Sequence, residues 1–261
     1  MTEPQHERYG IRKAVDFPTR DKSLPTRDLL VVPHRGKKLT ASYPTFRPNT
    51  FDKNVAEMQR AYTHSAELPQ ITFREPTTSQ SVSIANYRFG SDSEVDAKRD
   101  IFDPKWLQAG RIVRTKQGVI VNPILDAQGN VVLNQGDLEA IKTNARKIEV
   151  GNGHIYLGDK DFGFAEYTTF QLGIQDSDTF AQGGLARIVE HTEGLAVNLK
   201  AISSKQNYPN GVNIWSFEIP KEPIERVLGL YSDWSLVSGR LNVNGDGWGG
   251  WGDDGFAFGV R

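Results

Sequence analysis

Alternation of apolar and polar residues marks several strands along the chain. The clearest run is Val212–Ile219, where apolar and polar side chains alternate for eight residues, the period of a strand with one buried face. Two hairpins are predicted, 111–115 with 119–122 and 148–150 with 155–157, each across a short turn that contains glycine. The remaining strand candidates are 81–85, 131–133, 227–231, 241–243 and 256–260.

Helical spacing of apolar residues predicts three to four helices. The first is capped by Thr50 and ends near residue 66, and a short one over 103–110 has Asp103 as its cap and Gly110 as its stop. A third begins at Asp137, and the strongest runs from Asp176 or Asp178 to about residue 192. Strands and helices follow one another without regular βαβ alternation. We therefore expect an α+β fold with a mainly antiparallel sheet and a β-rich C-terminal third.

Proline and basic residues are concentrated at the N-terminus. Residues 1–50 hold ten Lys or Arg against five Asp or Glu, and six of the thirteen prolines. Because proline fixes φ and removes a hydrogen-bond donor, we expect residues 1–45 to form an arm with little regular structure. Residues 46–261 are then expected to form a single α+β domain. The arm is interpreted as a strap over that domain, with a nucleic-acid or partner-docking arm as the alternative.

Composition narrows the class of protein. The net charge of −1 creates no global field that favours nucleic acid, and no apolar run approaches the length that spans a bilayer. With no cysteine there is no thiol nucleophile and no thiolate metal site. The N-terminus lacks the apolar core of a signal peptide, so a cytoplasmic location is expected, with a virion protein or a mature secreted chain as the alternatives. No nucleotide-binding motif is present, and no cofactor is expected to be required.

The segment 242–256 is rich in glycine, carboxylates and amides and has no Lys or Arg. Laid against a D-x-D-x-D-G calcium loop, Asn242, Asn244 and Asp246 take the first three ligand positions and Asp253 the last. Two of the early ligands are neutral and no helix is predicted on either side. Calcium is therefore one hypothesis for this segment, and a glycine-rich turn between strands is the alternative.

Tryptophans in the same segment predict a second kind of site. Trp248 and Trp251 each lie beside glycine, which makes them poor candidates for a core. A sugar ring could stack on such an indole while a carboxylate such as Asp254 accepts its hydroxyl hydrogens. The alternative is that both indoles cover the end of the sheet or pack at a subunit interface.

A second acidic cluster offers candidate catalytic groups, because paired carboxylates can act as acid and base or share a divalent metal. Asp176-Ser177-Asp178-Thr179 resembles the D-x-D-x-T motif of haloacid-dehalogenase-type phosphatases, with the threonine one place early. The plainer interpretation is that Asp176 or Asp178 caps a helix. The members of the cluster are Asp159, Asp161, Glu166, Asp176 and Asp178.

The same stretch resembles the Asp-Cys-x-x-Phe turn of papain-like cell-wall hydrolases. That resemblance puts Ser177 at the nucleophile position and leaves His154 as a base in a permuted order. It covers five residues, and we do not adopt it. The interpretation preferred from the sequence is a non-enzymatic binding or structural module with a Trp/Gly/Asp-rich C-terminal surface for a glycan, calcium or protein partner. A carboxylate-dependent hydrolase and a viral or assembly protein are the alternatives.

Overall fold

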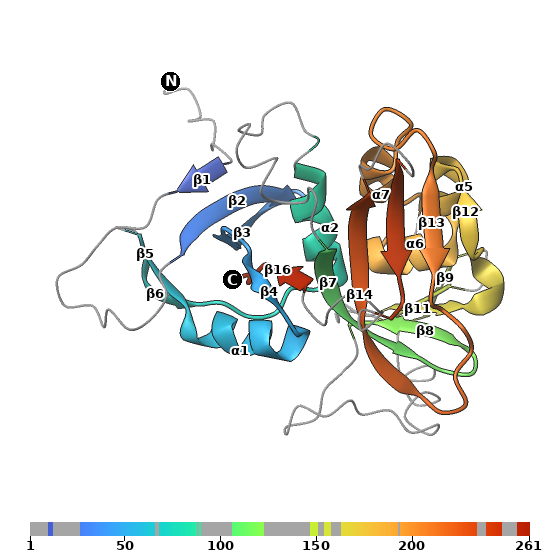
Figure 1. Ribbon diagram of the computed structural model, residues 1–261, viewed down its shortest axis with the longest axis horizontal. Coiled ribbons are helices and arrows are strands. Elements are labelled where there is room, and N and C mark those ends of the chain that lie inside the picture. Colours follow the sequence, from blue (N-terminus) through green and yellow to red (C-terminus); the bar gives the residue numbers. More distant parts are fainter. Residues whose placement is uncertain are drawn as a thin grey trace.

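The computed structural model confirms the α+β class, with a large, mainly antiparallel sheet, smaller strand groups and several helices (Figure 1). It describes residues 10–12, 27–65, 68–87, 89, 106–122, 147–150, 154–157, 163–192, 194–233, 239–246 and 255–261. The strand candidate 131–133 and the helix candidate beginning at Asp137 lie outside these residues. No helix in the described part is long and apolar enough to cross a membrane.

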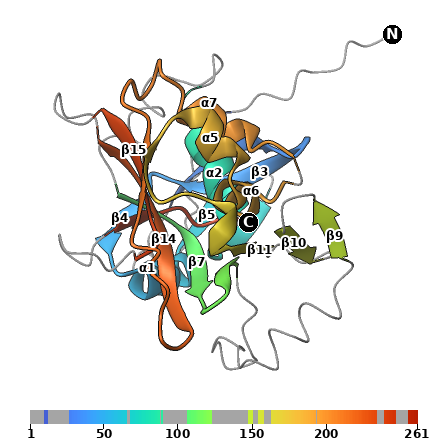
Figure 2. The ribbon, with the colours of Figure 1, turned by 90° about the vertical axis from the view of Figure 1, so that its right-hand side faces the viewer.

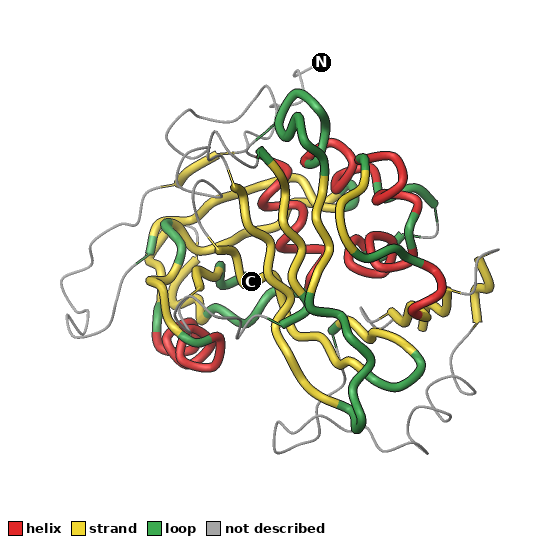
Figure 3. The backbone as a smooth tube through the Cα atoms, turned by 45° about the vertical axis from the view of Figure 1, so that its right-hand side comes forward, coloured by secondary structure: helices red, strands yellow, loops and turns green. Residues whose placement is uncertain are grey.

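The large sheet runs in the order β12-β13-β15-β14-β7-β8-β11-β10-β9, and β16 pairs with both β7 and β4. Its described pairs are antiparallel except β13–β15 and β16–β7, which are parallel. Figure 3 shows its strands side by side through the middle of the molecule. The strands are β4 Phe46–Asn49, β7 Trp106–Arg114, β8 Gly118–Val121, β9 Lys147–Val150, β10 His154–Leu157, β11 Gly163–Glu166, β12 Gly173–Gln175, β13 Val212–Trp215, β14 Ile224–Asp233, β15 Arg240–Asn244 and β16 Gly255–Ala257.

Both predicted hairpins are confirmed, as β7–β8 and β9–β10. The C-terminal third is β-rich, as expected. The alternating run that begins at Val212 ends as a strand at Trp215, because Ser216 has a φ of 59° and leaves the extended conformation.

The expectation that residues 1–45 contain little regular structure is wrong for much of that segment. β1 (Gly10–Arg12), β2 (Asp28–His34) and β3 (Lys37–Tyr43) form an antiparallel sheet of their own. The apolar run 29–32 is buried along its whole length, and it outweighs the effect of Pro33 at the end of the strand. The division into an arm and a single domain stays a prediction.

Helix α2 (Thr78–Tyr87) corrects the strand prediction for residues 81–85. Nine of its ten residues, all but Asn86, are buried, because the helix packs against β2, β7, α6 (Gly184–Glu190) and α7 (Val197–Ile202). A helix buried on all sides has no polar face, so its sequence lacks the helical period. Its polar side chains bond inside the fold instead: Thr78 Oγ1 donates to the carbonyl of Val189, and Ser83 Oγ lies 2.8 Å from His34 Nδ1.

Strand β7 corrects the helix prediction over 103–110 for residues 106–110. Gly110, expected to stop a helix, has a φ of 145° at a bulge opposite β14. A side chain there would lie 3.1 Å from the Thr78 methyl group. This glycine therefore makes room for the first turn of α2.

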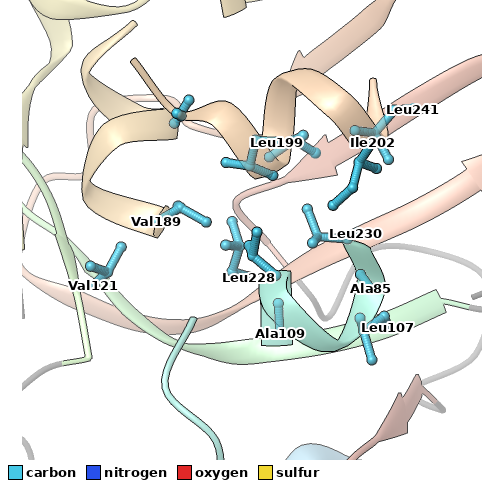
Figure 4. Packing of buried hydrophobic residues seen from close by; sticks show 14 of the residues in the cluster. Ala85, Leu107, Ala109, Val121, Val189, Leu199, Ile202, Leu228, Leu230 and Leu241 are labelled. Atoms are coloured by element: carbon cyan, nitrogen blue, oxygen red, sulfur yellow. The ribbon is translucent and has the colours of Figure 1, made fainter. Parts of the chain in front are cut away.

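Three short helices cover the inner face of the large sheet (Figure 2). They are α5 (Ser177–Gln182), α6 (Gly184–Glu190) and α7 (Val197–Ile202). The first two replace the single helix expected over 176–192, which is interrupted at the extended residue Gly183. Leu199 and Ile202 of α7 and Val189 of α6 pack toward Leu228 and Leu230 of β14 (Figure 4).

A smaller core lies on the other side of the molecule. Helix α1 (Phe51–Arg60) is capped by Thr50, as predicted, but it ends six residues earlier than expected. Strands β5 (Tyr62–Ser65) and β6 (Leu68–Thr72) follow it. The C-terminal residues also pack in this region, because Val260 forms isolated β-bridges with both Ala41 and Arg74. The small core consists of Leu29, Phe46, Phe51, Met58, Ala61, Phe73, Val227 and Ala257.

Candidate functional site

The outer face of the large sheet, opposite α5, α6 and α7, carries an unusual set of side chains. Strands β13, β15, β14 and β7 turn Ile214, Val243, Leu230 and Leu107 toward the core. Because side chains alternate along a strand, the residues between these core positions point outward. Seen in Figure 1, the helices lie behind these strands and the outer face is turned toward the viewer.

The register places one residue from each of five strands in a line across this face. Ile174 of β12 pairs with Asn213, Asn213 with Asn242, Asn242 with Tyr231, and Tyr231 with Trp106. Directly paired residues share a face of the sheet and stand close enough to touch. We call these five residues, none of them charged, the outer row.

Three aromatic rings gather at one side of the face. Trp106 stacks on Tyr231 with ring centroids 5.4 Å apart, and its edge meets Trp215 with centroids 6.2 Å apart. Trp215 lies two residues beyond Asn213 on β13, so both point outward. It keeps 36% of its surface exposed, which leaves a ring available to a ligand.

Gly229 determines where the Trp106 ring lies. A Cβ atom at residue 229 would come within 2.7 Å of Trp106 Nε1. The indole therefore lies directly over the backbone of β14. In the described part of the chain its N–H group is buried and has no hydrogen-bond partner, and its ring packs against Tyr231 and Trp215.

Two amides form the centre of the outer row. Asn213 Nδ2 donates to Asn242 Oδ1 over 3.2 Å, and both side chains are partly exposed. This bond uses one donor of Asn213 and one acceptor position of Asn242. Asn213 Oδ1 can accept a hydrogen bond from a ligand, and the Asn242 amino group can donate one. The pair therefore offers an acceptor and a donor side by side.

Asn242, Asn244 and Asp246, expected to bind calcium, come together, but their side chains have protein partners. Asn244 is fully buried, accepts from the backbone N–H of Asp246 and donates to its carbonyl, both over 2.8 Å. The Asp246 carboxylate lies 2.9 Å from the guanidinium of Arg226. Asn242 already accepts from Asn213. These contacts close a turn after β15 and compete with a cation for the same oxygens.

The four remaining C-terminal candidates, Trp248, Trp251, Asp253 and Asp254, lie outside the described residues. The structure does describe the residues that flank this segment, up to Asp246 and from Gly255 onward. The Gly255 carbonyl accepts from the buried Asn54 Nδ2 over 2.8 Å, and Asn54 also donates to Gln108 Oε1 over 2.7 Å. Residues 247–254 therefore join two anchored strand ends, β15 and β16.

The candidates at 176–178 form a helix start, as the plainer interpretation predicted. Asp176 Oδ1 accepts from the backbone N–H groups of Asp178 and Thr179, each over 2.9 Å, and Oδ2 accepts from Thr179 Oγ1. The Thr179 bonds lower the pKa of Asp176. Ser177 is the first residue of α5, and Asp178 pairs with Lys200.

The other catalytic candidates are His154, Asp159 and Asp161. His154 lies on β10, and Asp159 and Asp161 are outside the described residues. Within the ranges that the structure describes, no three Asp, Glu or His side chains are grouped so that they could hold a metal ion.

Sequence reasoning missed most of the outer row. Alternation over 212–215 and 241–243 did place Asn213 with Trp215 and set Asn242 apart from the core. Nothing in the sequence shows that β15 inserts between β13 and β14, and Trp106 was assigned to a helix. The face depends on that strand order.

Comparison with known proteins gives one likeness. No protein-family model matches the chain, and no curated protein matches it. A solved chain from the study "Accommodation of massive sequence variation in Nanoarchaeota by the C-type lectin fold" is similar to this chain, at 18% identity and a TM-score of 0.42. The match covers 83% of this chain and 97% of that one.

Proposed function

We propose that this protein is a glycan-binding module whose ligand lies on the outer face of the large sheet. The observation that carries the proposal is the outer row with Trp215 beside it: three aromatic rings and an amide pair, contributed by adjacent strands. Sugars present apolar C–H faces and hydroxyl groups together, and these groups match aromatic rings and amides respectively.

The absence of charge in the outer row favours an uncharged ligand. Near the row, Asp246 and Arg226 neutralise each other over 2.9 Å. A phosphate or sulfate group would meet no cation along the row, and a basic peptide would meet no carboxylate. Neutral sugars satisfy the amide donor and acceptor without the cost of burying a charge.

Rigidity of the face also supports binding. The rings and amides stand on hydrogen-bonded strands rather than on loops, and Asn244 braces the turn after β15 beneath them. A preformed surface loses little conformational entropy when a ligand docks. Of the 159–178 cluster, Asp176 and Asp178 belong to the start of α5, in the layer behind the sheet.

Variants of partly exposed residues test the proposal without unfolding the protein. Trp215→Ala removes an aromatic ring, and Asn213→Ala removes one amide of the pair. Each should weaken binding to neutral glycans by about tenfold, the equivalent of 1.4 kcal/mol. Val197→Ala is the matched control, because Val197 is 59% exposed but lies on α7, in the layer behind the sheet.

The measurement is calorimetric titration with neutral β-1,4-linked oligosaccharides of glucose, mannose and N-acetylglucosamine. Binding that is retained in Val197→Ala and lost in Trp215→Ala and Asn213→Ala supports the proposal. Equal binding by all variants, or binding by none of the proteins including the parent chain, contradicts it.

A further inference from the structure

The outer row extends further than one sugar ring. It crosses five strands from Ile174 on β12 to Trp106 on β7. Four gaps between strands of about 4.8 Å each give a length of roughly 19 Å. A hexose ring in a β-1,4-linked chain is about as long as one gap, so a single ring would contact only two members of the row.

The chemistry of the row changes along its length. Ile174 supplies an apolar contact at one end, Asn213 and Asn242 supply polar groups in the middle, and Tyr231 and Trp106 supply rings at the other end. A ligand that contacts every member must therefore carry both C–H faces and hydroxyl groups along its length. Each ring of a linear glycan carries both.

The end of the row at β12 lies at the edge of the sheet. In the described part of the chain, β12 pairs with β13 alone, and Ile174 is 61% exposed. A ligand that covers Ile174 would remove this apolar surface from water, which favours binding. The open edge also lets a longer chain continue beyond the site.

We infer that the outer row binds a linear, uncharged oligosaccharide of about four rings, laid across the strands from Trp106 to Ile174. The inference rests on the proposed glycan-binding function and specifies its ligand: an internal stretch of a chain rather than a terminal monosaccharide. Each ring occupies about one gap between strands.

A length series tests this inference apart from the function itself. The same three β-1,4-linked series are titrated from the monosaccharide to the hexasaccharide against the full chain. Affinity should rise with each ring, by about threefold to tenfold per ring, and level off at four or five rings. Equal affinity for the monosaccharide and the hexasaccharide overturns the inference while leaving glycan binding intact. No binding in any series overturns both.

Ile174→Ala locates the far end of the ligand. It should weaken tetrasaccharide and longer chains by about threefold, because these chains reach β12. Val197→Ala should leave their affinity unchanged. Thermal melting of each variant checks that the fold is kept. An Ile174→Ala protein that folds and binds long chains as the parent does contradicts the placement of the ligand.

Discussion

Gly229 on β14 and Trp106 on β7 are fitted to each other, because the missing side chain of one is the space that the indole of the other occupies. Through this contact Trp106 reaches both Tyr231 and Trp215, and the three rings form one aromatic group. Glycine in the interior of a strand usually weakens the strand. At residue 229 glycine is needed because the Trp106 ring lies so close to the backbone.

Gly229→Ala should therefore displace the Trp106 ring. The added methyl group would meet the indole at 2.7 Å, so we expect a loss of about 1–3 kcal/mol in unfolding free energy and weaker glycan binding. Chemical denaturation measures the first effect, and near-ultraviolet circular dichroism reports the ring movement. Gly194→Ala is the control, since a Cβ at residue 194 meets nothing within 4 Å. An unchanged aromatic spectrum in Gly229→Ala would show that Trp106 is not held this way.

Asp176, the cap of α5, predicts that the stability of the fold depends on pH. Hydrogen bonds from Thr179 and Asp178 to its carboxylate lower the pKa of Asp176 below the unfolded value of about 4. A lowered pKa means that the carboxylate stabilises the fold above about pH 4, and that this contribution is lost as the pH falls through the folded pKa.

Asp176→Ala should lower the unfolding free energy by about 1 kcal/mol at neutral pH. Asp176→Asn, a cap of similar strength that does not titrate, should keep most of the stability and remove this part of the acid sensitivity. Urea denaturation at several pH values compares the three proteins. An alanine variant that is as stable as the parent at neutral pH would contradict the assignment of Asp176 as the cap.

Arg111 forms ion pairs with three carboxylates, so its replacement is expected to have an electrostatic effect on stability. Its guanidinium contacts Asp52 over 2.7 Å, Glu75 over 3.1 Å and also Glu225, and so links α1, β14 and the residues before α2. Burial alone would lower the pKa of Arg111, but these carboxylates outweigh it and raise the pKa.

Arg111→Met keeps most of the apolar stem but leaves three carboxylates facing one another. We expect a loss of about 2 kcal/mol at neutral pH, and a smaller loss in acid, where the carboxylates are protonated. Arg111→Lys should recover only part of the stability, because an ammonium group cannot present the planar fork to three partners. The thermal midpoints of the parent and of the two variants, at neutral and at acid pH, measure these losses of stability. A loss that does not shrink in acid would exclude charge repulsion as its cause.

Calcium is expected to leave the stability unchanged. A true site would add about 2.7 kcal/mol at a hundredfold excess over Kd. Here Arg226 faces the Asp246 carboxylate, and the Asn242 and Asn244 oxygens already accept hydrogen bonds. Thermal melting with calcium and with chelator checks this. A calcium-dependent rise that Asp246→Asn abolishes and Asp178→Asn does not would restore the calcium hypothesis.

The fold class and the hairpins could be predicted from the sequence because they depend on local patterns. Thr50 and Asp176 were also predictable, since a cap bonds to residues two or three places away. Helix α2 was not, because burial on every side removes the polar face that gives a helix its period. Trp106 was misassigned because Asp-Pro before it and Gly110 after it imitate the ends of a helix.

The candidate site was harder still to predict. Asn242 was chosen as a metal ligand from its spacing within the chain, whereas its neighbours in space are Asn213 and Tyr231. These contacts arise from strand pairings between distant segments, and one sequence carries no record of strand order. Asn213, Trp215 and Asn242 did have a local signal, because each follows a buried apolar residue in an alternating stretch.

Two-dimensional NMR of the full chain tests the central claim most directly, by titration with the β-1,4-linked tetrasaccharides of glucose, mannose and N-acetylglucosamine in turn. The side-chain amide signals of Asn213 and Asn242 and the indole N–H signals of Trp106 and Trp215 should shift together with one of the ligands. Signals from α5, α6 and α7, behind the sheet, should stay in place. Shifts confined to residues outside the outer face, or no shift with any tetrasaccharide, would contradict glycan binding at this face.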